Sequence, residues 1–273
     1  VLRGRDIATL TSLADAIEIR DVENAMRFFL ARTGKSPAKK ENKSLAHHFA
    51  MMIVNMARHW VKLDEPSIKA LSALRDKVKD RTATSGLTEK NEARLSPLED
   101  PKKLHELANL PYKIFKDLPA KGKPTHADAL KAQVAVAIEI LLIAPIRREN
   151  LGNIEIGRHL ITLPGSGDML LSIPGEEVKN GVRITRPIPP SSAKLISLYI
   201  QRYRPVLMEG ASDHLFPGKC NGGKQKAWLA KQIADMIRKR TGLILNAHLF
   251  RHLAAMTYLD ANPGAYGVVR LLL

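Results

Sequence analysis

Three basic side chains lie within five positions of one another in the segment HLFRHLAA, which begins at His248. At about 100° per residue of an α-helix, His248, Arg251 and His252 fall on one polar arc. Asn246 is a good N-cap for a helix that begins near Ala247, and the positive end of a helix dipole favours an anion. The spacing therefore predicts a group that binds a phosphate.

A metal site is the first alternative for this segment, because histidines four residues apart on a helix can chelate zinc. The residues between the histidines include no glutamate, no third ligand is evident, and an arginine between them repels a cation. We therefore expect no metal. A second alternative is a satisfied polar pair, since nine histidines in a basic chain produce an H-x-x-R spacing on the order of once by accident.

A further arginine follows a helix breaker in the segment LLIAPIRRENL. Pro145 ends the preceding helix, and Arg147 comes next on a rigid support before the apolar Leu151. The neighbouring Arg148 is an alternative for the same role, and the spacing to Leu151 and Ile154 favours Arg147.

A lysine lies at the turn of an expected hairpin, VKNGVRITRPI, about thirty residues after this arginine. Asn180 and Gly181 predict a tight turn, which presents Lys179. Arg183 and Arg186 lie on the same hairpin and compete with Lys179 as its functional cation.

The order of Arg147, Lys179 and the group from His248 to Arg251, with the run LFPG before that group, resembles the tyrosine recombinase (phage integrase) family over residues 87–273. The run LAAMTYLDANPGAYGVVRLLL is also similar to the family's continuation. The resemblance implies site-specific DNA cleavage and rejoining through a covalent 3′-phosphotyrosine intermediate, with no metal or other cofactor. It also implies a mainly α fold, in which a helical core-binding-like domain precedes a mainly helical catalytic domain with a small antiparallel sheet.

The resemblance also implies a role for each basic residue. Arg147 and Arg251 would hold the non-bridging oxygens of the scissile phosphate and stabilise the charge of the transition state. Lys179 would protonate the departing 5′ oxygen as a general acid. His248 would donate to the phosphate or relay a proton, and His252 would support the site.

Two features depart from the family's pattern. Asn150 stands where the family usually has a glutamate, and it could orient Arg147 by hydrogen bonding without adding a charge. Tyr258 and Tyr266 follow Arg251 too closely to be the nucleophile, and we interpret them as packing or surface residues. We therefore expect the nucleophile to be absent from this chain, which would be inactive in cleavage although its full-length parent cleaves DNA.

Composition points to a polyanionic partner. Lysine and arginine number 43 against 27 aspartate and glutamate, which gives a formal charge of +16 and a pI of about 10.0. Both halves of the chain carry the excess, so both can face double-stranded DNA. We interpret Lys224, Lys226 and Lys231 as solvated or backbone-contacting, and the lysine-rich stretch from Gly34 to Ser44 as a loop.

Other sequence features bear on the compartment. Cys220 is the single cysteine, so no intrachain disulfide can form, and a reducing cytosolic compartment is the expected setting. The resemblance to the recombinase family implies a bacterial cytoplasm with nucleoid association. The longest apolar stretch, residues 134–146, contains Glu139 and is too short to span a bilayer, so no membrane partner is expected.

Hydrophobic periodicity predicts the elements that position these residues. Helices are expected at 5–32, 43–62 and 66–80, and Leu45, Phe49, Met52, Ile53 and Met56 would form the core face of the second. A polar stretch at 81–101 indicates a linker, with domains at 1–86 and 87–273.

In the second domain, residues 127–144 predict a buried helix, and residues 154–189 predict a small antiparallel sheet. Helical patterns then return twice before the segment that begins at His248.

Several functional alternatives remain open. A non-catalytic DNA-binding regulator would explain the charge and the helices, but not the ordered spacing of the basic residues. A type IB topoisomerase shares the same phosphate chemistry. The resemblance further implies a homotetramer on DNA for the parent, and we expect a monomer without DNA.

Overall fold

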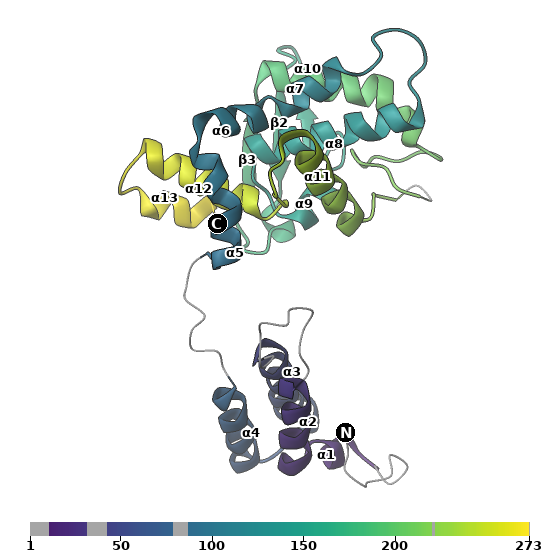
Figure 1. Ribbon diagram of the computed structural model, residues 1–273. Coiled ribbons are helices and arrows are strands. Elements are labelled where there is room, and N and C mark those ends of the chain that lie inside the picture. The colour runs from purple at the N-terminus through teal and green to yellow at the C-terminus, as the bar shows by residue number, and fades with distance from the viewer. Residues whose placement is uncertain (1–10, 32–42, 79–86, 220–221, 273) are drawn as a thin grey trace. The chain divides into compact units, whose positions relative to one another are not determined.

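The computed structural model describes residues 11–31, 43–78, 87–219 and 222–272. The chain divides into two compact units, Val1–Gly86 and Leu87–Leu273 (Figure 1). The described residues are mainly helical, with a small three-stranded antiparallel sheet in the C-terminal unit. The predicted fold class, mainly α with one small sheet, is therefore confirmed. Among the described residues, no helix is long and apolar enough to cross a membrane.

The N-terminal unit is a small helical bundle. Its helices are α1 (Leu13–Ala16), α2 (Ile19–Ala31), α3 (Lys43–Met56), a π-helical turn (Ala57–Val61) and α4 (Glu65–Lys77). The single helix expected over 5–32 is wrong for the described part, because a capping box formed by Ser12 and Asp15 starts a short helix that ends before α2. Of the lysine-rich loop, residues 34–42 lie outside the described residues, and Lys43 and Ser44 begin α3.

The core face predicted for α3 is wrong in part. Leu45 is 37% exposed and Met52 is 49% exposed, whereas Ala46 and Ala50 are buried with Ile53. Small side chains let α2 and α4 approach α3 closely, and this close packing turns the larger side chains at the edges of the stripe toward solvent.

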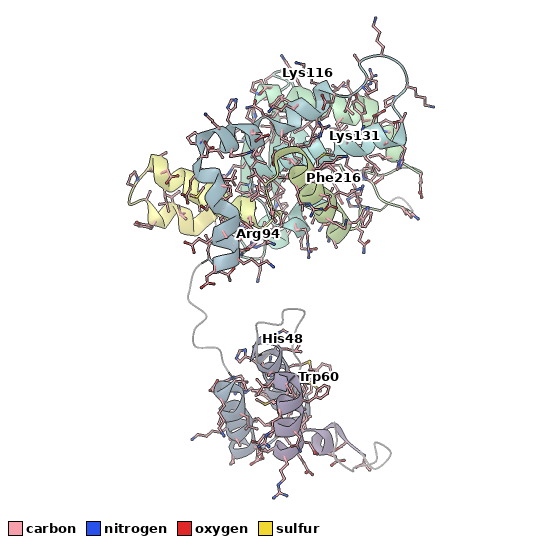
Figure 2. All side chains as sticks on the ribbon, in the orientation of Figure 1. His48, Trp60, Arg94, Lys116, Lys131 and Phe216 are labelled. Atoms are coloured by element: carbon pink, nitrogen blue, oxygen red, sulfur yellow. The ribbon has the colours of Figure 1, made fainter. Side chains whose placement is uncertain are left out.

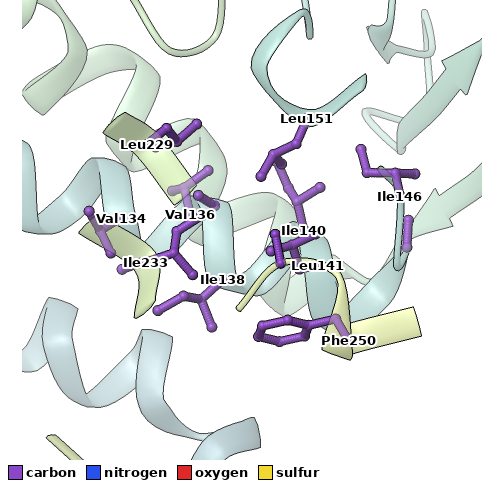
Figure 3. Packing of buried hydrophobic residues seen from close by; sticks show 14 of the residues in the cluster. Val134, Val136, Ile138, Ile140, Leu141, Ile146, Leu151, Leu229, Ile233 and Phe250 are labelled. Atoms are coloured by element: carbon purple, nitrogen blue, oxygen red, sulfur yellow. The ribbon is translucent and has the colours of Figure 1, made fainter. Parts of the chain in front are cut away.

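The C-terminal unit is built around α8 (His126–Ile143), which is buried nearly all round as predicted. A capping box formed by Thr125 and Asp128 starts the helix, because the Thr125 hydroxyl accepts from the Asp128 amide at 3.1 Å. Side chains from α8 meet side chains from α9 (Arg148–Gly152), α11 (Lys226–Thr241) and α12 (Leu249–Ala261) in one hydrophobic core (Figure 3). The helix therefore lies at the centre of the core of the unit.

The remaining helices surround this core. They are α5 (Glu89–Leu95), α6 (Pro101–Ala108), α7 (Leu110–Lys116), α9 (Arg148–Gly152), α10 (Pro190–Leu198), α11 (Lys226–Thr241), α12 (Leu249–Ala261) and α13 (Tyr266–Leu272). The linker expected over 81–101 is wrong from residue 89 onward, because α5 and a 3-10 turn (Ser96–Glu99) occupy it. Leu95 and Leu98 from these two elements are buried in the core, and residues 81–86 lie outside the described residues.

The sheet consists of β1 (Leu160–Thr162), β2 (Met169–Ile173) and β3 (Ile184–Ile188), paired in that order. The pairing of β2 with β3 ends at Ile173 opposite Ile184, so ten residues connect the two strands. The predicted two-residue turn at Asn180 and Gly181 is therefore wrong. Instead, the connection holds a 3-10 turn (Gly175–Glu177) and a bend in which the Gly181 amide donates to the Val178 carbonyl at 2.8 Å.

Candidate active site

Arg147 lies at the junction of α8 and α9, where it occupies the N-cap position of α9 with extended backbone dihedral angles. The preceding residue, Ile146, is 2% exposed and belongs to the hydrophobic core of the unit (Figure 3). The neighbouring Arg148 is exposed, and its Nη2 lies 3.1 Å from the Glu149 carboxylate. Arg147 thus stands on a fixed support, while Arg148 makes a surface ion pair.

Arg251 lies in the first turn of α12 and is 6% exposed. Its Nη1 donates to the Pro145 carbonyl at 3.2 Å, which ties α12 to the segment directly before Arg147. Burial, and then the positive charge of Arg147, lower the pKa of Arg251 from its usual value, although an arginine remains charged at neutral pH. The two arginines are therefore close enough to repel each other.

Both arginines line one cavity of about 300 Å³. Its wall is shared by the junction of α8 and α9, the connection before β3, β3 itself, α12 and α13. The polar lining residues are Arg147, Asn180, Arg183, Arg186 and Arg251, and the apolar ones include Val178 and Val268. No acidic side chain is among the lining residues. A concave site with four guanidinium groups and no carboxylate is suited to an anion.

His248 and His252 lie beside this cavity and do not line it. His248 is exposed at the N-cap of α12, and its Nε2 is 3.3 Å from Nε2 of the half-buried His252. Burial, His248 and Arg251, in that order, lower the pKa of His252. Helix α12 begins at Leu249, two residues later than expected, although the Asn246 side chain still accepts from the Leu249 amide at 3.1 Å.

Lys179 lies in the connection between β2 and β3, where its side chain is exposed. It is not among the residues that line the cavity, whereas its neighbour Asn180 is. Arg183 and Arg186, the competing cations of the same hairpin, both line the cavity. Arg183 and Arg186, and not Lys179, therefore provide the positive charge on the side of the cavity that the sheet forms.

A polar cluster pins the connection that carries Lys179. The Asn150 amide donates to the Glu177 carbonyl at 2.8 Å, so the side chain of Asn150 supports this connection and not Arg147. The Glu177 carboxylate pairs with Arg158 and lies 3.1 Å from Nε2 of His159, which is 2% exposed. No sequence signal indicated Glu177 or His159, because the cluster forms only when the hairpin folds over α9.

The remaining candidates lie elsewhere. Tyr266 is 70% exposed. Lys226 and Lys231 pair with Glu149 and Asp235 at 3.0 and 2.6 Å. Cys220 lies outside the described residues.

The prediction for Lys224 is wrong, because its Nζ donates to the buried Gln133 side chain at 2.5 Å. Burial lowers the pKa of Lys224 to about 8.

Two other features of the described residues bear on function. A hollow of about 500 Å³ on the N-terminal unit is lined by residues that include His48, Met52 and Trp60, and Trp60 is 77% exposed (Figure 2).

No group of three or more histidine, cysteine, aspartate or glutamate side chains is placed to hold a metal ion in the part of the chain that the structure describes.

No family model and no curated protein matches the sequence. Among solved structures, the chain is similar to the site-specific recombinase XerH bound to its difH substrate before cleavage. The identity is 15% and the TM-score 0.49, over 93% of this chain and 71% of that one.

A post-cleavage complex of XerH with palindromic difH gives a TM-score of 0.46 at 15% identity, over 88% of this chain and 65% of that one. The XerA recombinase gives a TM-score of 0.39 at 14% identity, over 92% of this chain and 80% of that one. At these scores the likeness assigns no role to any residue.

Proposed function

We propose that the C-terminal unit is the phosphate-activating part of a site-specific DNA recombinase of the tyrosine recombinase family. One observation carries the proposal: Arg147 and Arg251, far apart in the sequence, line the same cavity, and no acidic side chain lines it. Double-stranded DNA is the proposed partner, consistent with the formal charge of +16.

The two arginines have the chemistry that the reaction needs. Each guanidinium can form two parallel hydrogen bonds to a phosphate, so Arg147 and Arg251 together can hold both non-bridging oxygens of one phosphodiester. Because Arg251 is buried and Ile146 fixes Arg147, little reorganisation is needed as negative charge builds on those oxygens. The repulsion between the two arginines is relieved when a phosphate enters.

The proposed bond changes are those that the resemblance to the tyrosine recombinase family implies. A tyrosine hydroxyl releases its proton to solvent, and its oxygen attacks the phosphorus atom and forms a phosphotyrosine ester to the 3′ end of the strand, while the bond from phosphorus to the 5′ oxygen breaks. Lys179 delivers the proton to that leaving oxygen, which requires its connection to turn the amine toward the cavity. His248 donates to the phosphate or relays a proton, His252 supports it, and the nucleophile comes from outside residues 1–273.

The experiment uses the natural chain continued beyond Leu273, incubated with a pool of nicked duplexes of random sequence. Covalent protein–DNA adducts are then trapped by denaturation, and the linkage is identified by mass spectrometry of the modified peptide. We expect a phosphotyrosine adduct in the wild type. Arg147→Ala and Arg251→Ala should each lower its yield by at least about a hundredfold, the size of effect seen when one oxyanion donor is removed.

The controls separate catalysis from binding. Arg148→Ala removes the adjacent surface arginine and should leave the adduct yield unchanged. Duplex affinity, measured by fluorescence anisotropy, should remain within about tenfold of the wild type in all three variants, because many other phosphate contacts persist. Tight DNA binding with no adduct in the wild type would indicate a regulator. Relaxation of supercoiled DNA without a specific site would indicate a type IB topoisomerase.

The N-terminal unit is proposed as a second DNA-binding module, the core-binding-like domain. Assembly of four subunits on DNA, and association with the bacterial nucleoid, follow as further parts of the same proposal. Sedimentation of the continued chain with and without its DNA site tests the assembly.

A further inference from the structure

The arginine cavity holds more positive charge than one phosphodiester can neutralise. Arg147, Arg183, Arg186 and Arg251 line it, whereas a phosphodiester carries a single negative charge. Two arginines can already hold both non-bridging oxygens of one phosphate. Arg183 and Arg186 are therefore left over when the scissile phosphate is bound by the other two.

The surplus arginines have no carboxylate to neutralise them. Across the described ranges, no ion pair involves Arg147, Arg183 or Arg186, and Arg186 donates through Nη1 to the Thr185 carbonyl at 3.0 Å. Elsewhere in the same unit, exposed arginines such as Arg158 and Arg240 do pair with carboxylates. The absence of acids is thus a property of this cavity and not of the unit's surface.

The four arginines also differ in depth. Arg251 is buried and Arg147 is half-buried, whereas Arg183 and Arg186 are exposed on the connection before β3 and on β3. The cavity volume of about 300 Å³ is many times the roughly 10–15 Å³ that one water molecule needs by a comparable measure, which leaves room beside one phosphate. The cavity therefore has an inner pair and an outer pair of cations.

We infer that the cavity binds two consecutive phosphodiesters of one DNA strand, the reacting one at Arg147 and Arg251 and its neighbour at Arg183 and Arg186. A DNA strand is the ligand with this pattern, because it carries one charge per about 3.4 Å of helix axis. The inference rests on the proposed function and extends it from one phosphate to two. Arg183 and Arg186 are then phosphate-binding residues that set the register of the strand.

The test compares two ligands on the chain of residues 1–273. A thymidine dinucleotide has one phosphodiester and a thymidine trinucleotide has two, and binding is followed by NMR titration of the protein amides. We expect the trinucleotide to bind roughly tenfold more tightly than the dinucleotide, the size of one charge-assisted contact. In the double variant Arg183→Ala/Arg186→Ala, this advantage should vanish while dinucleotide affinity stays within about twofold.

A second pair of variants separates charge from position. Lys113→Ala/Lys116→Ala removes two exposed positive charges from α7, away from the lining of the cavity (Lys116 is labelled in Figure 2), and should leave both affinities unchanged. Arg183→Lys/Arg186→Lys keeps the charges and should restore part of the trinucleotide advantage. Equal loss in the α7 variant, or no recovery with lysine, would overturn the inference.

Failure of the inference can be told apart from failure of the proposed function. If dinucleotide binding is lost in Arg147→Ala and Arg251→Ala but the trinucleotide has no advantage in the wild type, only the second phosphate site is disproved. If dinucleotide binding does not depend on Arg147 and Arg251 at all, the proposed function loses its phosphate site, and the inference fails with it.

The salt dependence of binding to duplex DNA gives a further measurement. Each phosphate contact made by Arg183 and Arg186 should add about −0.9 to the slope of log affinity against log salt concentration.

Discussion

Two sets of arginines in the C-terminal unit use their donors in opposite ways. Arg204 is 8% exposed, and its guanidinium donates to the Ser212 carbonyl and, at 2.7 and 3.0 Å, to the His214 carbonyl. Arg202 likewise donates to the carbonyls of Pro119, Ala120 and Gly122. Among the cavity arginines, Arg251 donates to the Pro145 carbonyl and Arg186 to the carbonyl of its neighbour Thr185, and no acidic side chain lines the cavity beside them.

The comparison distinguishes arginines that stabilise the fold from arginines that can bind an anion. A guanidinium surrounded by backbone carbonyls satisfies groups that would otherwise be buried without partners. A guanidinium in an open cavity, beside other cations and with no acid, keeps its donors for an anion that arrives later. Removal of the first kind should affect stability, and removal of the second kind should affect binding.

The largest effect is expected from Arg204→Ala. The substitution leaves the carbonyls of the half-buried Ser212 and His214 without these donors and opens a void where the buried Arg204 side chain lay, so the free energy of unfolding should fall by about 3 kcal/mol. Urea denaturation followed by circular dichroism measures the change. A loss below about 1 kcal/mol would mean that this arginine does not hold the fold and would remove the contrast.

An intermediate effect is expected from Asn150→Ala. The amide of Asn150 is buried and supports the Glu177 carbonyl, so its loss should cost about 1–2 kcal/mol. Hydrogen exchange should also speed up at the Gly181 amide, which is bonded within the same connection. Asn150→Asp tests the geometry, because a carboxylate cannot donate to that carbonyl and should not restore protection.

A small effect on stability is expected from Arg147→Ala. No ion pair is lost within the described residues, and the repulsion on Arg251 is relieved, so the free energy of unfolding should change by less than about 0.5 kcal/mol. The same variant should lose dinucleotide binding. Urea denaturation and NMR titration of one sample give both values, and a marked loss of stability would place Arg147 with the structural arginines.

A change in the pH dependence of stability, and not a loss of stability at neutral pH, is expected from Lys224. Burial lowers its pKa from 10.5 to about 8, so the folded protein releases the proton before the unfolded chain does. Below pH 8 the lysine is charged in both states and the full burial penalty is present. As the pH rises from about 8 to 10.5, the folded state binds fewer protons, and stability should rise.

Lys224→Met removes this titration and provides the comparison. The free energy of unfolding of the wild type, relative to the variant, should increase across that pH window and stay constant below it. Thermal melts in buffers from pH 7 to 11 would show the difference. A flat difference would mean that Lys224 is solvated, as the sequence had suggested.

Much of the fold follows from local signals in the sequence. The all-apolar pattern around Val136 predicts α8 to within a residue or two, because this signal acts within a few turns of the chain. The capping box of Thr125 and Asp128 sets the observed first residue. Pro145 likewise marks the end of that helix. The sheet is predicted by alternation, but its long connection is not, because the pairing register depends on what covers each face.

The misreadings share one cause. The sequence predicts that Met52 lies in the core, but Ala46 and Ala50 are buried and Met52 is exposed. The neighbouring helices determine which face of α3 is covered. Similarly, α5 is too short for its hydrophobic periodicity to be detected in the sequence. Burial of Leu95 in the core stabilises this helix. In each case the deciding contact comes from residues distant in the chain.

By itself, the sequence determined which residue types could handle a phosphate, where the long buried helix runs, and that the chain carries a large positive charge. Those properties depend on composition and on neighbours within a few positions. Only the tertiary structure decided that Arg147 and Arg251 share a cavity, that Arg183 and Arg186 complete its lining while Lys179 does not, and that Glu177 is bound by Asn150. Such contacts join segments whose separation along the chain carries no information about their distance in space, so packing of the core around α8 had to set them.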